Sequence, residues 1–140
     1  MKRVAAGCMR VAPILAFALA LLGCVGQAAR SGKNDEPAAS SDAVKTVTTF
    51  YTRAANDDFK GAWALGTDKL HAQFPGGFHT FKATVATLES IEFPTIEATD
   101  PNTVEFTSIA RHTNRTDRCN GTATLVEGMI DHLSVQCGPE

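Results

Sequence analysis

The chain has 140 residues, with 13 lysines and arginines against 15 aspartates and glutamates, so its formal net charge is −2. This balance excludes the strongly basic surface that binding to a nucleic-acid backbone requires. The length is sufficient for one domain with a modest hydrophobic core, once a targeting segment is set aside.

The first 23 residues have the pattern of an export signal. Lys2, Arg3 and Arg10 form a basic region without acids, and an apolar stretch follows over residues 11–22. That stretch is shorter than the roughly 20 apolar residues of a membrane-spanning helix. The pattern therefore predicts a signal peptide over residues 1–23 that is removed after export.

Leu21-Leu22-Gly23-Cys24 ends the apolar stretch and resembles the lipobox of bacterial lipoproteins. The resemblance implies that Cys24 is lipidated and becomes the mature N-terminus, and that the partner of this end of the protein is a membrane. An alternative is cleavage after Ala28, which would discard Cys24 and give a secreted protein. Under either alternative the protein is exported; under the first it is anchored at a cell membrane or cell surface.

Residues 24–40 are small and polar without apolar periodicity, which predicts a flexible tether. Residues 41–140 then form the folded domain. Because three basic residues precede Cys24, the mature part would keep ten basic and fifteen acidic residues, a formal charge of about −5.

The first half of this domain has helical periodicity. Ser41 or Asp42 is a capping residue for a first helix, and Asn56-Asp57-Asp58 interrupts it. Shorter helices are expected after this break and after Gly66-Thr67-Asp68, and a last one follows Pro75-Gly76-Gly77. The apolar positions that define the four helices are Val44, Val47, Phe50 and Ala54; Phe59, Ala62 and Trp63; Leu70 and Phe74; and Phe78, Phe81, Val85 and Leu88.

From Glu89 onward the apolar period changes to two, which predicts strands. Turn residues divide this half into four strands, over residues 89–99, 103–112, 118–126 and 130–137. Pro94 lies within the first strand and predicts an edge position or a bulge.

The last hairpin predicts a disulfide. If the reversal centres on Gly128, Cys119 lies opposite Cys137, and Leu125 opposite Asp131. Both cysteines then share the apolar face of the sheet, close enough for a bond. This register requires a three-residue turn or a bulge.

Helices followed by antiparallel strands indicate an α+β fold with the helices on one face of the sheet. The segment VTTFYTRAANDDFKGAWALGTDKLHAQFPGGFHTF and the strand half with TVEFTSIARHT and GTATLVEGMIDHLSV resemble nuclear transport factor 2-like domains. The resemblance implies a cone, also called cystatin-like, in which helices and a curved four-stranded sheet enclose a pocket. Members of this family use the pocket for isomerase or hydratase chemistry, for small-molecule binding, or for protein contacts.

The expected pocket is mostly apolar, with Tyr51 and Asp131 as its polar groups. Phe50, and not Tyr51, takes the position where isomerase-type members place a tyrosine, and no acid stands where they place their general base. No catalytic residue is therefore predicted. The candidate lining is Phe50, Tyr51, Trp63, Phe81, Leu125, Asp131 and Leu133.

No metal site and no cofactor are predicted, because His71, His79, His112 and His132 lack ligand-like spacing. The sequence thus favours a membrane-anchored, non-catalytic binding or interaction module, with an apolar small molecule or an envelope protein as partner. The alternatives are an isomerase- or hydratase-type enzyme and a structural accessory domain of an envelope assembly.

Overall fold

The computed structural model describes the backbone of residues 38–140 and the side chains of residues 42–140. The predicted signal peptide, Cys24 and most of the predicted tether lie outside these residues. The elements are the helices α3 (Ala38–Ala55), α4 (Phe59–Trp63), α5 (Asp68–His71) and α6 (Phe78–Val85), and the strands β1 (Leu88–Asp100), β2 (Thr103–His112), β3 (Arg115–Val126) and β4 (Met129–Pro139). Within the described part, no helix has the length and apolarity needed to cross a membrane.

The helices form where the sequence predicts them, but three boundaries differ. Helix α5 ends at His71, so Phe74, expected on its apolar face, follows the helix. Helix α3 begins at Ala38, so residues 38–40, expected in the tether, are helical. Helix α6 ends at Val85, and Leu88, expected on its apolar stripe, begins β1 instead. Side chains cap the two short helices: the Asp58 carboxylate accepts from the Gly61 N–H at 3.0 Å, and the Thr67 hydroxyl from the Leu70 N–H at 3.4 Å.

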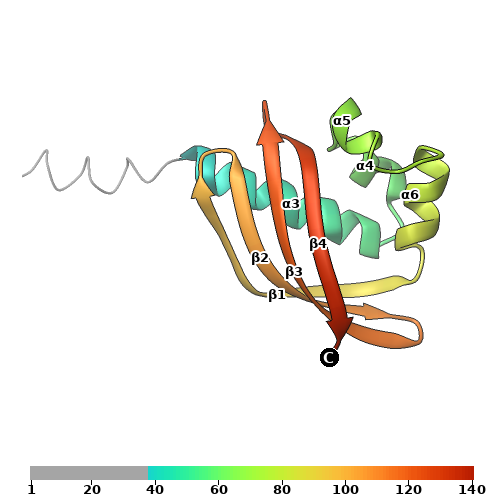
Figure 1. Cartoon of the computed structure of the whole chain (residues 1–140). Helices are drawn as coiled ribbons and strands as arrows, with labels where there is room; N and C mark the ends of the chain where they lie inside the picture. Colours follow the sequence, from blue (N-terminus) through green and yellow to red (C-terminus); the bar gives the residue numbers. More distant parts are fainter. Residues whose placement is uncertain (1–37) are drawn as a thin grey trace, which may run out of the picture. The chain divides into compact units, whose positions relative to one another are not determined.

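The strands form one antiparallel sheet in the order β1-β2-β3-β4, and the helices cover one face of it (Figure 1). Strand β1 is therefore an edge strand, and its register with β2 shifts between Glu92 and Thr95. Both observations confirm the interpretation of Pro94. Strands β3 and β4 are longer than predicted, beginning at Arg115 and Met129.

The register of the last hairpin is as predicted over most of its length. Cys119 pairs with Cys137, and the same offset continues to Thr124 opposite His132. Glu127 and Gly128 form a two-residue turn, both with positive φ, of 51° and 78°. A register shift follows this tight turn, so Leu125 pairs with Ile130 and the predicted pairing with Asp131 is wrong.

The core lies between α3 and the inner face of the sheet. Val47 and Phe50 of α3 are buried, as are Val104, Ala123 and Ile130 of the strands. A glycine allows close packing on this face: a Cβ added to Gly121 would lie 2.2 Å from the ring of Phe106 on the neighbouring strand. The Phe106 ring therefore covers Gly121 and occupies the place that a side chain would take.

Candidate functional site

The inner face of the sheet, α3 and α6 enclose a pocket of about 370 Å³. Most of its lining is apolar, and no Asp, Glu, Lys or Arg of the described residues belongs to it. The lining residues are Phe50, Tyr51, Gln73, Phe74, Phe81, Thr84, Val85, Leu88, Ile91, Ser108, Ala110, His112, Cys119, Leu133, Val135 and Cys137.

The pocket exists because the inward side chains of β2 become small. Phe106 fills the space beneath α3, but the next two inward positions are Ser108 and Ala110. Both are buried, at 2% and 6% exposure, and both line the cavity. Small residues between a phenylalanine and His112 therefore leave room that the helices do not fill.

Tyr51 brings a phenol hydroxyl to the lining of the pocket. Its ring packs edge-to-face against Phe50, Phe93 and Phe106, at centroid distances of 5.2, 5.9 and 5.6 Å. Burial raises the pKa of its phenol well above the usual range, because desolvation disfavours the phenolate. Tyr51 is therefore a neutral donor at any physiological pH.

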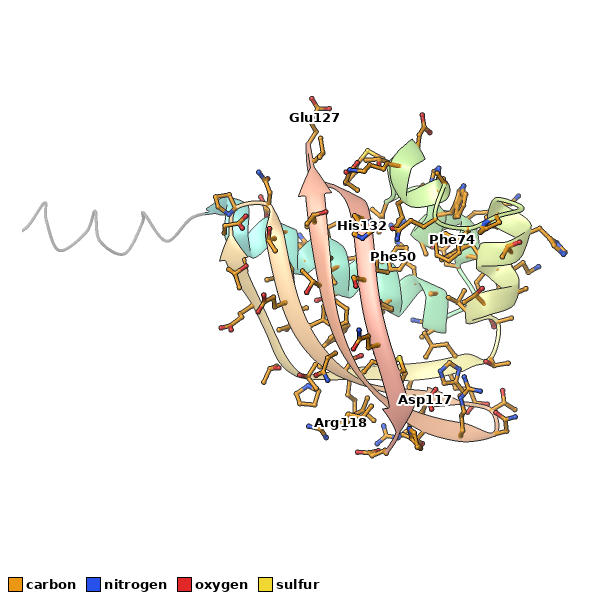
Figure 2. The ribbon with its side chains drawn as sticks, in the orientation of Figure 1. Phe50, Phe74, Asp117, Arg118, Glu127 and His132 are labelled. Carbon is orange, nitrogen blue, oxygen red and sulfur yellow. A yellow bond between two sulfur atoms is a disulfide. The ribbon has the colours of Figure 1, made fainter. Side chains whose placement is uncertain are left out.

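Four of the seven predicted lining residues are in the pocket: Phe50, Tyr51, Phe81 and Leu133. Phe50 and Phe74, another lining residue, lie between the sheet and the short helices in Figure 2. Trp63 is not in the lining. Its ring stacks on that of His71, with the centroids 3.8 Å apart, and packs against the ring of Phe81. Leu125 belongs to the core, with 4% of its surface exposed.

Asp131 is also outside the pocket, and here the sequence prediction fails because of the register shift. Its carboxylate accepts a hydrogen bond from the Thr67 hydroxyl at 2.8 Å and lies 3.1 Å from Lys69 Nζ. These contacts, with the Thr67 hydrogen bond foremost, lower the pKa of Asp131. It ties α5 to β4 and does not face a ligand.

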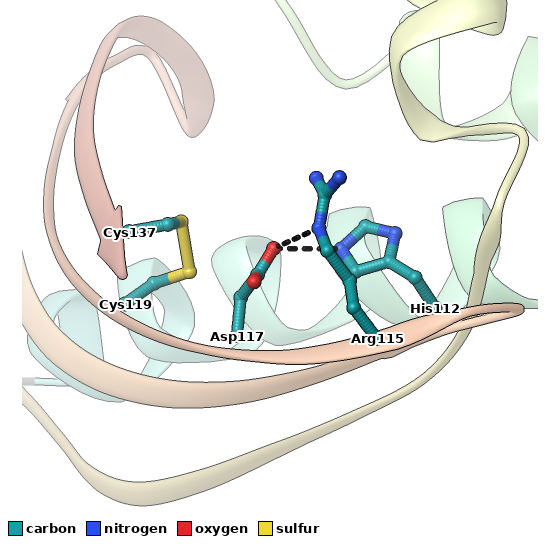
Figure 3. Close-up of a disulfide and its surroundings, with 5 residues drawn as sticks. All are labelled: His112, Arg115, Asp117, Cys119 and Cys137. Atoms are coloured by element: carbon teal, nitrogen blue, oxygen red, sulfur yellow. Dashed lines mark hydrogen bonds and ion pairs between the residues drawn. A yellow bond between two sulfur atoms is a disulfide. The ribbon is translucent and has the colours of Figure 1, made fainter. Parts of the chain in front are cut away.

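A polar cluster that the sequence did not predict adjoins the pocket, formed by Thr87, His112, Arg115 and Asp117. Figure 3 shows the last three of these residues beside the disulfide. One oxygen of Asp117, Oδ2, accepts from Arg115 Nε at 2.8 Å and lies 3.7 Å from His112 Nε2. The other ring nitrogen of His112, Nδ1, is 2.9 Å from the Thr87 hydroxyl. Alternation along β3 could have found Asp117, since it is two residues from Cys119 on the same face.

The disulfide between Cys119 and Cys137 is present and forms part of the pocket wall. Cys119 is buried on β3, whereas Cys137 is exposed on the edge strand β4. The bond therefore holds the outer strand of the pocket in place at this end.

Gln73 holds β4 on the same side. Its side-chain amide donates to the Leu133 carbonyl at 3.0 Å and accepts from the Leu133 N–H at 2.9 Å. Gln73 and Leu133 both line the pocket. This pair of hydrogen bonds therefore fixes β4 against the segment that follows α5.

Among the residues that the structure describes, no group of three or more His, Cys, Asp or Glu side chains is arranged to hold a metal ion. The four histidines are dispersed: His71 stacks on Trp63, His112 joins the polar cluster, and His79 and His132 are on the surface.

Comparison with known proteins identifies the fold through structure alone. No protein-family model matches the chain, and no curated protein matches it in sequence. Among solved structures it is similar to an LEH-like epoxide hydrolase from M. tuberculosis, with a TM-score of 0.54 and 18% identity over 71% of this chain and 84% of that one.

Two further structures are similar. A protein assigned as a ketosteroid isomerase, from Kribbella flavida DSM 17836, has a TM-score of 0.58 and 7% identity over 72% of this chain and 81% of that one. A computationally designed 17-OHP binder has a TM-score of 0.53 and 16% identity over 71% of this chain and 98% of that one. At these identities the likeness concerns the fold, which is the nuclear transport factor 2-like α+β cone with helices packed on a curved four-stranded antiparallel sheet.

Proposed function

We propose that the domain binds a small, mainly apolar molecule in the cone pocket and does not transform it. The observation that carries this proposal is the lining itself: a cavity of about 370 Å³ with apolar walls and a neutral Tyr51 phenol. Such a pocket favours apolar ligands that offer one hydrogen-bond acceptor.

The similar structures include enzymes as well as a designed binder. The choice between catalysis and binding therefore depends on the residues that line the pocket. Acid–base chemistry on a bound substrate needs a titratable group within hydrogen-bond reach of the reacting atom. Asp131, the carboxylate expected inside, lies outside the pocket, and the lining contains no carboxylate. Its titratable side chains are Tyr51, a neutral donor, and His112, whose ring nitrogens lie 2.9 Å from the Thr87 hydroxyl and 3.7 Å from Asp117 Oδ2. An accessory domain without a ligand would instead have filled this space with its own side chains.

Filling the pocket tests this proposal. Val85→Trp adds an indole to the lining near the end of α6, while Val126→Trp adds the same group at an exposed position outside it. We expect decan-1-ol and progesterone to raise the melting temperature of the wild type and of the Val126→Trp variant, because ligand binding stabilises the folded state. The Val85→Trp variant should respond to neither compound. Stabilisation that survives Val85→Trp would contradict binding in this pocket, and turnover of a probe would favour the enzyme alternative.

We further propose that the protein is an exported lipoprotein anchored through Cys24. The basic N-terminus, the short apolar stretch and the Leu-Leu-Gly-Cys motif support this proposal. Stable anchoring requires more than one acyl chain, so the mature protein should enter the detergent phase on phase separation, and Cys24→Ala should abolish this. Mass spectrometry of the mature N-terminus provides the decisive measurement: an unmodified N-terminus at Ala29 would reject lipidation.

A further inference from the structure

The inner face of the sheet changes from apolar to charged within a few residues of the pocket. Along β3, Cys119 lines the pocket, Asp117 follows two residues earlier, and Arg115 two residues before that. Successive alternate residues share a face of a strand, so all three lie on the inner face. His112, which lines the pocket, pairs directly with Arg115 across β2 and β3.

Asp117 orients Arg115 without using its whole guanidinium. The Asp117 side chain is 12% exposed, and its Oδ2 accepts from Arg115 Nε at 2.8 Å. No described residue accepts a hydrogen bond from Nη1 or Nη2 of Arg115. In Figure 3 these terminal nitrogens rise from the strand on the side where the disulfide and His112 stand.

A guanidinium held at Nε presents Nη1 and Nη2 as a planar pair of donors, which matches the two oxygens of a carboxylate. The His112 side chain is 14% exposed and is held by Thr87. It lies between the apolar lining and Arg115, which carries these two nitrogens. Because Arg115 is the direct cross-strand neighbour of His112, a molecule whose apolar part lies in the pocket can bring a polar end to Arg115.

From this arrangement we infer that the ligand of the pocket is an amphipathic monocarboxylate, with its hydrocarbon part in the pocket and its carboxylate on Arg115. The inference rests on the proposed binding function and names the class of ligand. It also assigns Arg115 as a specificity-determining residue, since an uncharged ligand of equal length lacks the partner for Nη1 and Nη2.

A pair of matched ligands and a pair of matched variants test the inference. Decanoate and decan-1-ol share a chain length and differ at the polar end. Arg115→Gln removes the inner-face guanidinium, and Arg118→Gln removes one from the same strand, where Arg118 is exposed on the opposite face. Binding is measured by calorimetry on the full chain carrying Cys24→Ala, so that no attached acyl chain competes for the pocket.

We expect decanoate to bind about threefold more tightly than decan-1-ol, a difference typical of one charge contact on a side chain that is 64% exposed. Arg115→Gln should abolish this preference, Arg118→Gln should keep it, and Arg115→Lys should restore part of it if Arg115→Gln disturbs folding. Equal affinity for both probes in the wild type, or a preference that persists in Arg115→Gln, would overturn the inference while leaving the proposed function intact. Binding of neither probe would overturn both.

Discussion

The two ends of the β3–β4 hairpin carry an aspartate each, and the two carboxylates have different surroundings. At the turn end, marked by Glu127 in Figure 2, Asp131 contacts Thr67 and Lys69 from α5 and the loop before it. At the open end, marked by Asp117 and Arg118, the polar partners of Asp117 within residues 38–140 are two neighbours on the sheet, His112 and Arg115.

The helices account for this difference. Near the turn, backbone hydrogen bonds join the α4–α5 loop to Ile130: Thr67 N–H donates to the Ile130 carbonyl at 2.9 Å, and Ile130 N–H to the Leu65 carbonyl at 2.8 Å. The last hydrogen bond from the helical half to β4 is the one between Gln73 and Leu133. Beyond Leu133, the disulfide joins β4 to β3. The pocket lies beside this part of β4, so the covalent bond holds one of its walls.

The largest effect is expected from breaking the covalent end. The disulfide joins residues 18 apart in the sequence, and opening a loop of this size costs about 3 kcal/mol of folding free energy. Reduction, or the double change Cys119→Ala with Cys137→Ala, should therefore lower the urea midpoint and weaken ligand binding, while far-ultraviolet circular dichroism keeps its native form. Free thiols at both positions in the folded, air-oxidised protein would show that the bond does not form.

An intermediate effect is expected at the boundary between the two ends. Gln73→Met removes both hydrogen bonds to the Leu133 backbone but keeps a long side chain. The expected loss of folding free energy is about 1 kcal/mol, the net contribution of an exposed hydrogen-bonded contact. The Leu133 amide should also exchange faster with solvent. Gln136→Met, an exposed glutamine on the other face of β4, is the matched control, and equal effects of the two changes would contradict a special role for Gln73.

The smallest effect is expected at the turn end. Because contacts with Thr67 and Lys69 lower the folded-state pKa of Asp131, its ionised form stabilises the fold above its ordinary pKa. That stabilisation is lost as the pH falls below about 4 and through the folded-state pKa. Asp131→Asn should therefore lower the melting temperature slightly at neutral pH and reduce the acid sensitivity of the protein. Glu105→Gln, which removes one carboxylate at an exposed position of β2, is the matched control.

Periodicity predicted most of the fold because it reports which face of an element is buried. The alternation of apolar and polar residues along β3 and β4 was sufficient to place Cys119 opposite Cys137. The same pattern carries no information on a bulge, which moves one residue out of the alternation. Asp131 was therefore predicted to face the pocket, and the structure shows it bonded to Thr67 at the start of α5, outside the pocket.

The pocket was predictable only in part, because burial does not say whether a side chain meets a cavity or another side chain. Trp63 and Leu125 are apolar residues that were predicted to line the pocket, but both pack against the protein's own core. Ser108 and Ala110 create the cavity by being small, a signal that a search for large apolar residues passes over. Arg115 was not among the predicted lining residues; it adjoins the pocket through its pairing with His112 across β2 and β3, which composition and spacing alone do not reveal.

The hydrogen bonds of Gln73 affect whether the edge strand β4 can pair with a strand of another chain. An edge strand presents free backbone N–H and C=O groups on which a strand of another chain can form. By satisfying both groups of Leu133, the Gln73 amide occupies the place that a residue of such a strand would take. The helical half of the molecule thus blocks intermolecular sheet growth along β4 at Leu133, on the side of the strand where the pocket lies.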